Sequence, residues 1–135
     1  LGYYSNEPGS QELPTITGMP EATLSYIRSR GIEPTVGNYL VLVGDEDSEI
    51  FLDRFDALFS PGLSMPTVPL VMPEMRLSDH LCYWDEGYPA LMLTDTALFR
   101  NPNYHKHTDT VETLDFQAMA SITENLVSAI QRLCA

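Results

Sequence analysis

Residues 78–116, SDHLCYWDEGYPALMLTDTALFRNPNYHKHTDTVETLDF, decide the fold class and the functional hypothesis. The stretch contains a short apolar run at 90–93, which predicts a strand, with titratable side chains on both sides of it. Asp79 and His80 precede the run, and His105 follows it. In α/β proteins, sites form where polar side chains meet at strand ends. We therefore look for a functional site here and interpret the rest of the chain as scaffold.

Strand and helix patterns alternate along the chain. Apolar residues at helical spacing, with capping residues at their ends, predict helices. Continuous apolar runs predict strands. The predicted helices cover residues 20–30, 50–59, 78–86 and 113–133, and the predicted strands cover residues 39–43, 68–72 and 90–93. This alternation indicates an α/β layer architecture that is closed by the long C-terminal helix.

Other local patterns add detail to this prediction. The run YLVLV at 39–43 predicts a strand that is buried on both faces. Pro69 predicts an edge or irregular strand, because proline has no N–H to donate to a neighbour. Residues 1–18 predict the end of a strand followed by a loop, and residues 95–112 predict a long polar loop, a kind that is usually functional or mobile. Cys82, in an aromatic segment, is expected to be a buried thiol.

Length and charge exclude several classes of function. The chain has 135 residues, the size of one domain, and a formal net charge of −12. Nucleic acids and anionic membrane surfaces require cationic patches, so neither is expected as a partner. No run approaches the ~18 apolar residues that a membrane span needs. Because the chain starts with Leu1 instead of Met, we expect it to be a piece of a longer protein.

The residue types alone leave several assignments open. His105 and His107 each offer a loop imidazole for a transition metal, and their spacing does not select one; both are equally consistent with surface histidines. Asp79, at a helix start, is either an ionised functional carboxylate or a capping residue, and His80 beside it can be a partly buried histidine. Trp84 and its aromatic neighbours form either a pocket wall or core.

The sequence lacks the short motifs of common catalytic sites. It contains no HExxH, GxSxG, P-loop or GxGxxG pattern. A catalytic zinc site typically has three protein ligands and an open position. One or two loop histidines cannot complete such a site, so the chain is not expected to be a metalloenzyme by itself.

The order of motifs resembles a known family. Ser78-Asp79-His80, Trp84, Gly87 to Ala90, Tyr104-His105, Asp109-Thr110 and Thr113 to Phe116 follow the pattern of the zinc-dependent exopeptidases that include the di-zinc aminopeptidases. GYYSNEPGSQ at 2–11 and GNYLVLVGD at 37–45 are similar to the bacterial branch of this family. The resemblance covers most of the chain and is weakest over 12–36 and 60–76.

This resemblance implies roles for individual residues. His105 matches the last zinc ligand of the family, which favours it over His107. Asp79 matches an active-site carboxylate near the metal. Ser78 and Tyr104 are implied neighbours of the substrate pocket, to which we also assign Trp84. The implied reaction is hydrolysis of an N-terminal peptide bond, with two zinc ions and an activated water.

The remaining zinc ligands and the general base of this family lie in segments upstream of the matched region. Residues 1–135 are therefore expected to form a single partial domain: the C-terminal part of a three-layer αβα sandwich with a mostly parallel mixed sheet. Alone, the chain should be inactive and bind zinc weakly at most. Expected partners are a peptide substrate and either the missing N-terminal part or a second copy.

Two rival functions remain. A glutaminyl-cyclase-like transferase shares the fold and carries a single zinc. A non-catalytic interaction module would retain the fold without the metal. Because many members of the family are exported, the resemblance implies a periplasmic or extracellular location.

Overall fold

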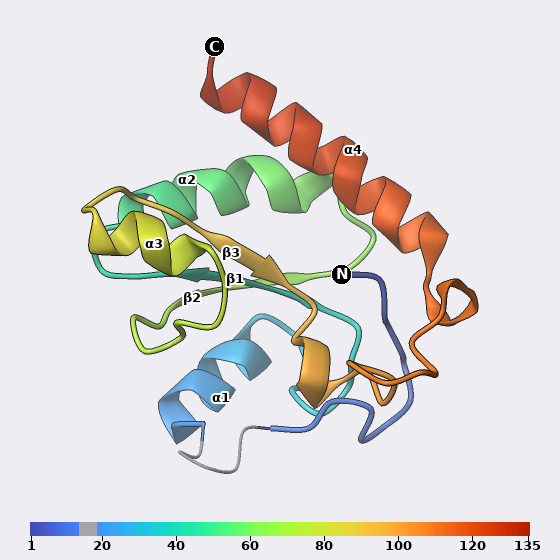
Figure 1. Cartoon of the computed structure of the whole chain (residues 1–135). Helices are drawn as coiled ribbons and strands as arrows, with labels where there is room; N and C mark the ends of the chain where they lie inside the picture. Colours follow the sequence, from blue (N-terminus) through green and yellow to red (C-terminus); the bar gives the residue numbers. More distant parts are fainter. Residues whose placement is uncertain (14–18) are drawn as a thin grey trace.

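The computed structural model describes residues 1–13 and 19–135 and has an α/β fold, as predicted (Figure 1). Within these residues, three 3-10 turns, η1 (Ser60–Gly62), η2 (Ala97–Phe99) and η3 (Val111–Thr113), lie between the main elements. The helices and strands are α1 (Glu21–Ser29), β1 (Leu40–Gly44), α2 (Glu49–Phe59), β2 (Thr67–Val71), α3 (His80–Asp85), β3 (Met92–Thr94) and α4 (Phe116–Leu133). No described helix is long and apolar enough to cross a membrane.

The described strands form one mixed sheet in the order β2-β1-β3. β1 runs parallel to β2 and antiparallel to β3, with Leu42 opposite Pro69 on one side and Leu93 on the other. Every residue of β1 is buried, which confirms the predicted double-sided burial. β2 is an edge strand, so the prediction from Pro69 is also confirmed.

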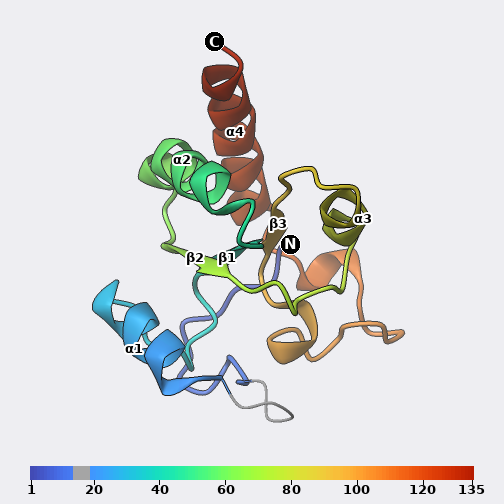
Figure 2. The ribbon, with the colours of Figure 1, turned by 90° about the vertical axis from the view of Figure 1, so that its left-hand side faces the viewer.

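The two faces of β1 belong to two separate apolar clusters. Leu40 and Leu42 pack with residues of α2 and α4, such as Phe59. Val41 and Val43 pack on the opposite face with residues of α1 and α3. This alternation follows from the two-residue period of a strand. Figures 1 and 2 show the resulting layers, with α2 and α4 on one side of the sheet and α1 on the other.

The start of the chain differs from its prediction, because the structure has no strand there. The backbone N–H of Tyr3 donates to Asp95 Oδ2 (3.2 Å), and that of Ser5 donates to the carbonyl of Gly37 (2.9 Å). These bonds hold the segment extended without a ladder partner. Part of the predicted loop, residues 14–18, lies outside the described residues.

The start of α4 also differs from its prediction, at Phe116 instead of residue 113. The Asp115 carboxylate accepts a hydrogen bond from the N–H of Ala118 (2.9 Å), so this residue is the N-cap and a 3-10 turn precedes it. The apolar spacing of the helix includes Phe116, Ile122 and Ile130. Of these, Ile122 is buried, whereas Phe116 and Ile130 are exposed.

The segment around α3 matches its prediction more closely. The helix begins at His80 and ends before Gly87, whose φ of 75° favours glycine. Cys82 is exposed, and the prediction of a buried thiol is therefore wrong: it lies on the outer side of α3, while Trp84 lies on the inner side.

Replacing Ile122 tests the packing of α4 on the sheet. Ile122 is 3% exposed among the residues of α2 and β1, so Ile122→Ala should lower the free energy of unfolding by about 2–5 kcal/mol in urea denaturation. Ile130 on the same helix is 48% exposed, and Ile130→Ala should cost about 1 kcal/mol or less. Equal losses would contradict the assignment of the packed face.

Candidate functional site

The predicted site residues Ser78 and Asp79 lie at the start of α3. Both side chains are exposed, and Asp79 occupies the N-cap position without a side-chain capping bond. The Asp79 carboxylate is therefore not used to hold the helix, which leaves it available for a ligand. Together with His80 it lines a surface groove of about 420 Å³ along residues 89–93.

His80 and Trp84 serve the fold. His80 is buried, its Nε2 lies 2.7 Å from the carbonyl oxygen of Met75, and its ring meets that of Trp84 edge-on at 4.5 Å. A carbonyl only accepts, so His80 Nε2 is the donor. The indole N–H of Trp84 donates to the Ala90 carbonyl (3.0 Å), and the side chain is buried in the apolar cluster that contains Val41 and Val43.

His105 lies on the loop between β3 and α4. Its ring stacks on that of Tyr104, with centroids 4.0 Å apart and planes inclined by 15°, and its φ is 56°. Histidine is enriched among the few non-glycine residues that adopt this conformation. His105 and His107 are both exposed. The stacking restrains the imidazole of His105 in an exposed position, where it can bind a metal.

An apolar cavity of about 270 Å³ brings two of the predicted residues together. Ser78 and Tyr104, which are far apart in sequence, both line it. Its floor is the face of the sheet that carries Val41 and Val43, and methionines such as Met75 form part of its walls. Methionine side chains adapt to the shape of a ligand, so the cavity suits one large apolar group. Trp84 does not line this cavity; it lies in the core beside it.

A buried polar cluster around Arg100 holds the base of the loop between β3 and α4, which carries His105. Arg100 Nε donates to Gln11 Oε1 (2.9 Å), and Nη1 donates to the carbonyl of Tyr39 (2.9 Å). The Thr96 hydroxyl also donates to Gln11 Oε1 (2.8 Å). The guanidinium lies over the ring of Tyr39, 5.0 Å from its centroid. These contacts connect the loop to the start of β1 and to the N-terminal segment.

The burial of Arg100 has an electrostatic cost. Desolvation lowers the pKa of its guanidinium below the ordinary value, and interactions with Tyr39 and Asp95 partly offset this. Burial also raises the pKa of Tyr39, again partly offset by the cation. Sequence reasoning missed this cluster. Its one sequence signal was an arginine inside a polar loop, which normally indicates an exposed side chain.

The described residues do not complete a metal centre. In residues 1–13 and 19–135, no three His, Cys, Asp or Glu side chains lie close enough together to hold an ion. A catalytic zinc needs three protein ligands.

Comparison with known proteins identifies a relative but no family. No family model matches the chain, and no solved structure does. The chain is 31% identical over 134 residues to the "Uncharacterized protein YfbL" of Escherichia coli (strain K12). The match includes 96% of this chain and 38% of YfbL, so the chain corresponds to only part of its relative.

Replacing Arg100 tests its role in the structure. Arg100→Met should lower the free energy of unfolding by about 2–4 kcal/mol, because Gln11 and Tyr39 lose a charged donor in a buried site. Arg28→Met removes an exposed ion pair with Glu21 and should change stability by about 1 kcal/mol or less. Urea denaturation measures both, and an unchanged midpoint for Arg100→Met would contradict the role.

Proposed function

We propose that this chain is the C-terminal part of the catalytic domain of a zinc-dependent exopeptidase of aminopeptidase type. The observation that carries the proposal is the shared cavity of Ser78 and Tyr104. The family resemblance implies both residues as pocket neighbours, and the fold brings them together from two distant segments. His105 directly follows Tyr104, so the implied metal ligand lies beside the implied substrate pocket.

In this proposal each residue has a separate role. The apolar cavity receives the side chain of the residue at the peptide N-terminus, since it contains mostly aliphatic, methionine and aromatic groups. Asp79, whose side chain makes no capping hydrogen bond, is the active-site carboxylate. His105 contributes one imidazole nitrogen to a zinc site whose other ligands, and whose general base, lie outside this chain.

Two structural features support a partial domain. Every residue of β3 is only half-buried, and its outer edge has no partner among the described strands. The backbone nitrogen of Leu1 lies 3.6 Å from Asp95, directly after β3, so a preceding segment would enter beside this open edge (Figure 1). We propose that the missing part of the domain adds its strand there.

Activity measurements test the proposed function. The 135-residue chain should show no aminopeptidase turnover with or without added zinc, whereas the product of the complete reading frame that encodes it should hydrolyse leucine p-nitroanilide in a zinc-dependent way. In that longer protein His105→Ala should reduce kcat/KM by about 100-fold or more. Replacing a residue that only hydrogen-bonds to a metal ligand already costs about 10–100-fold, and removing the ligand itself should cost more. His107→Ala is the matched control and should retain activity.

Several outcomes would contradict the proposal. Turnover by the 135-residue chain alone would mean that it builds a complete site from residues outside the proposed site. Cyclisation of an N-terminal glutamine substrate without peptide hydrolysis by the longer protein would favour the glutaminyl-cyclase-like alternative. Absence of both activities and of zinc would favour a non-catalytic module.

The open edge of β3 predicts association of the isolated chain. Light scattering after size exclusion should give a mass above the monomer value of 15.1 kDa that increases with concentration. The association should strengthen with salt, because each copy carries a net charge of −12 and salt screens the repulsion. A compact monomer at all concentrations would contradict the open edge and favour an independent module.

A further inference from the structure

The outer face of α4 carries an apolar stripe that no described element covers. Its side chains recur at alternating steps of four and three residues, which places them on one face of the helix, and all are exposed: Phe116, Ala120, Thr123, Val127, Ile130 and Cys134. Phe116, Val127 and Ile130 are 59%, 49% and 48% exposed. The hydroxyl of Thr123 donates to the Met119 carbonyl (2.8 Å), so this residue presents mainly its methyl group to solvent. We call these residues the outer stripe.

The outer stripe is separate from the face of α4 that packs on the sheet. Ile122 and Ala129 form that packed face, together with residues of α2 and β1. A helix on the surface of a protein normally has one apolar face and a polar face opposite to it. A helix with a second apolar face is typical of a position between two neighbours. The sequence of α4 therefore indicates a partner on the side away from the packed face.

The outer stripe has the size of a helix–helix contact. α4 contains 18 residues, so it is about 27 Å long at 1.5 Å per residue. Its C-terminal half has α2 on one side and no described element on the other (Figure 2). Single exposed apolar side chains are common on protein surfaces, whereas contiguous apolar patches mark interaction sites. The stripe belongs to the second kind, because no charged residue interrupts it.

The shape of the outer stripe suits a second helix. Ala120 and Thr123 are small, and they lie between the larger side chains of Phe116 and Val127. Helices pack by inserting the side chains of one into the hollows between side chains of the other. Alternating steps of four and three residues are also the spacing at which two helices stay in contact along their length. The best match is an amphipathic helix with the same spacing.

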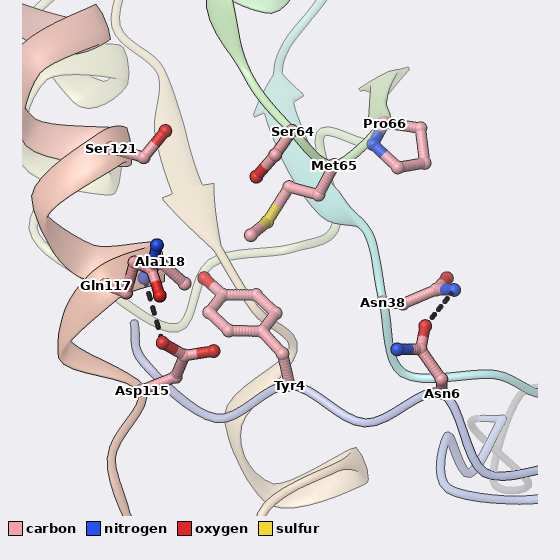
Figure 3. A pocket seen from close by; sticks show the side chains of 10 residues that line it. All are labelled: Tyr4, Asn6, Asn38, Ser64, Met65, Pro66, Asp115, Gln117, Ala118 and Ser121. Carbon is pink, nitrogen blue, oxygen red and sulfur yellow. Dashed lines mark hydrogen bonds between the residues drawn. The ribbon is translucent and has the colours of Figure 1, made fainter.

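The N-terminal segment approaches the first turn of α4, and this favours a partner from the same polypeptide. The N–H of Asp115 donates to the Gly2 carbonyl (2.8 Å), and Gly2 lies against the side chain of Met119. Figure 3 shows Tyr4 of the same segment beside Asp115 and Ala118. Because Leu1 also lies near Asp95, a preceding segment would enter between the open edge of β3 and the start of α4.

The length of the relative and the charge of the chain point to the same partner. The chain matches only 38% of YfbL, so more than half of that protein lies outside the match, which is ample length for further helices. A second copy of the chain would instead bring a net charge of −12 towards another −12. That repulsion disfavours pairing of two α4 helices.

We propose that an amphipathic helix from the part of the longer polypeptide upstream of Leu1 packs along the outer stripe. It extends the helix layer of α2 and α4, and its large apolar side chains lie over Ala120 and Thr123. The inference rests on the proposed partial domain, but it does not depend on the peptidase chemistry. It adds a second contact with the missing part, separate from the strand pairing at β3.

Thiol labelling of the product of the complete reading frame tests this proposal. Val127→Cys places a thiol on the outer stripe, and Ser128→Cys is the matched control on the polar side of α4; both positions are exposed in this structure. N-ethylmaleimide should label Val127→Cys about tenfold or more slowly than Ser128→Cys, because labelling of a covered thiol requires local opening. Peptide mass spectrometry measures both rates, which should become equal in urea.

Photo-cross-linking identifies the covering segment. The photoreactive residue p-benzoylphenylalanine replaces Gln131, which is exposed and lies at the edge of the outer stripe. Irradiation should link it to a peptide upstream of Leu1, and the product should keep the monomer mass on a denaturing gel. The same group in place of Ser128 is the control and should not form this link.

Two results would overturn the proposal. Equal labelling of the two cysteines in the folded longer protein would show that the outer stripe faces solvent. A cross-link from position 131 at the dimer mass would show that a second copy covers it. Neither readout depends on enzyme activity. Slow labelling of Val127→Cys in a protein without zinc-dependent turnover would support this inference and contradict the peptidase function, and an active aminopeptidase with equal labelling would do the reverse.

Discussion

The burial of β1 on both faces is the constraint on which the other elements depend. A strand with one apolar face has its register set by the hydrophobic pattern, because a slip by one residue would expose that face. In β1 both alternating sets are apolar, so the pattern cannot select the register. Packing at the ends of the strand does so instead, because main-chain hydrogen bonds form equally well in every register. In the register of this structure, the N–H of Leu40 donates to the Pro66 carbonyl (2.9 Å), and that of Met72 donates to the Gly44 carbonyl (2.8 Å).

Close packing at Gly44 adds to this restraint. A Cβ there would lie 3.2 Å from the Cβ of Ser48 and 3.3 Å from Leu91, so the strand ends at the one residue that allows this approach. At the other end, the Tyr39 carbonyl receives a hydrogen bond from Arg100. The loop that carries His105 is therefore fixed to the same strand that organises the core, and a change in that strand would reach the candidate site.

The elements with strong local patterns were predictable from sequence. Leu40–Gly44 is a continuous apolar run, Pro69 excludes a central strand, and Gly87 terminates a helix, so each carries its own signal. The start of α4 was less predictable, because Thr113 and Asp115 are both good caps and the choice depends on which side-chain oxygen reaches a free N–H.

The parts that sequence missed depend on contacts between distant residues. The segment at residues 1–5 is apolar and aromatic enough to suggest a strand, but its N–H groups bond to Asp95 and Gly37. Arg100 lies in a polar loop, and only the approach of Gln11, 89 positions away, shows that it is buried. The cavity of Ser78 and Tyr104 likewise forms only when two segments meet. The resemblance implies these two residues as pocket neighbours, and both line this cavity.

The two edges of the sheet are protected unequally, and only the edge of β3 is open. It can be covered by a second copy of the chain or by a strand of the same polypeptide. Pro69 removes a donor from β2, whereas the short β3 contains no proline and remains open. Two copies that met at β3 would each bring a net charge of −12, which opposes close approach. A strand in the same polypeptide has a high effective concentration and needs no encounter between two such charges. In a longer protein, intramolecular pairing at β3 should therefore prevail over self-association.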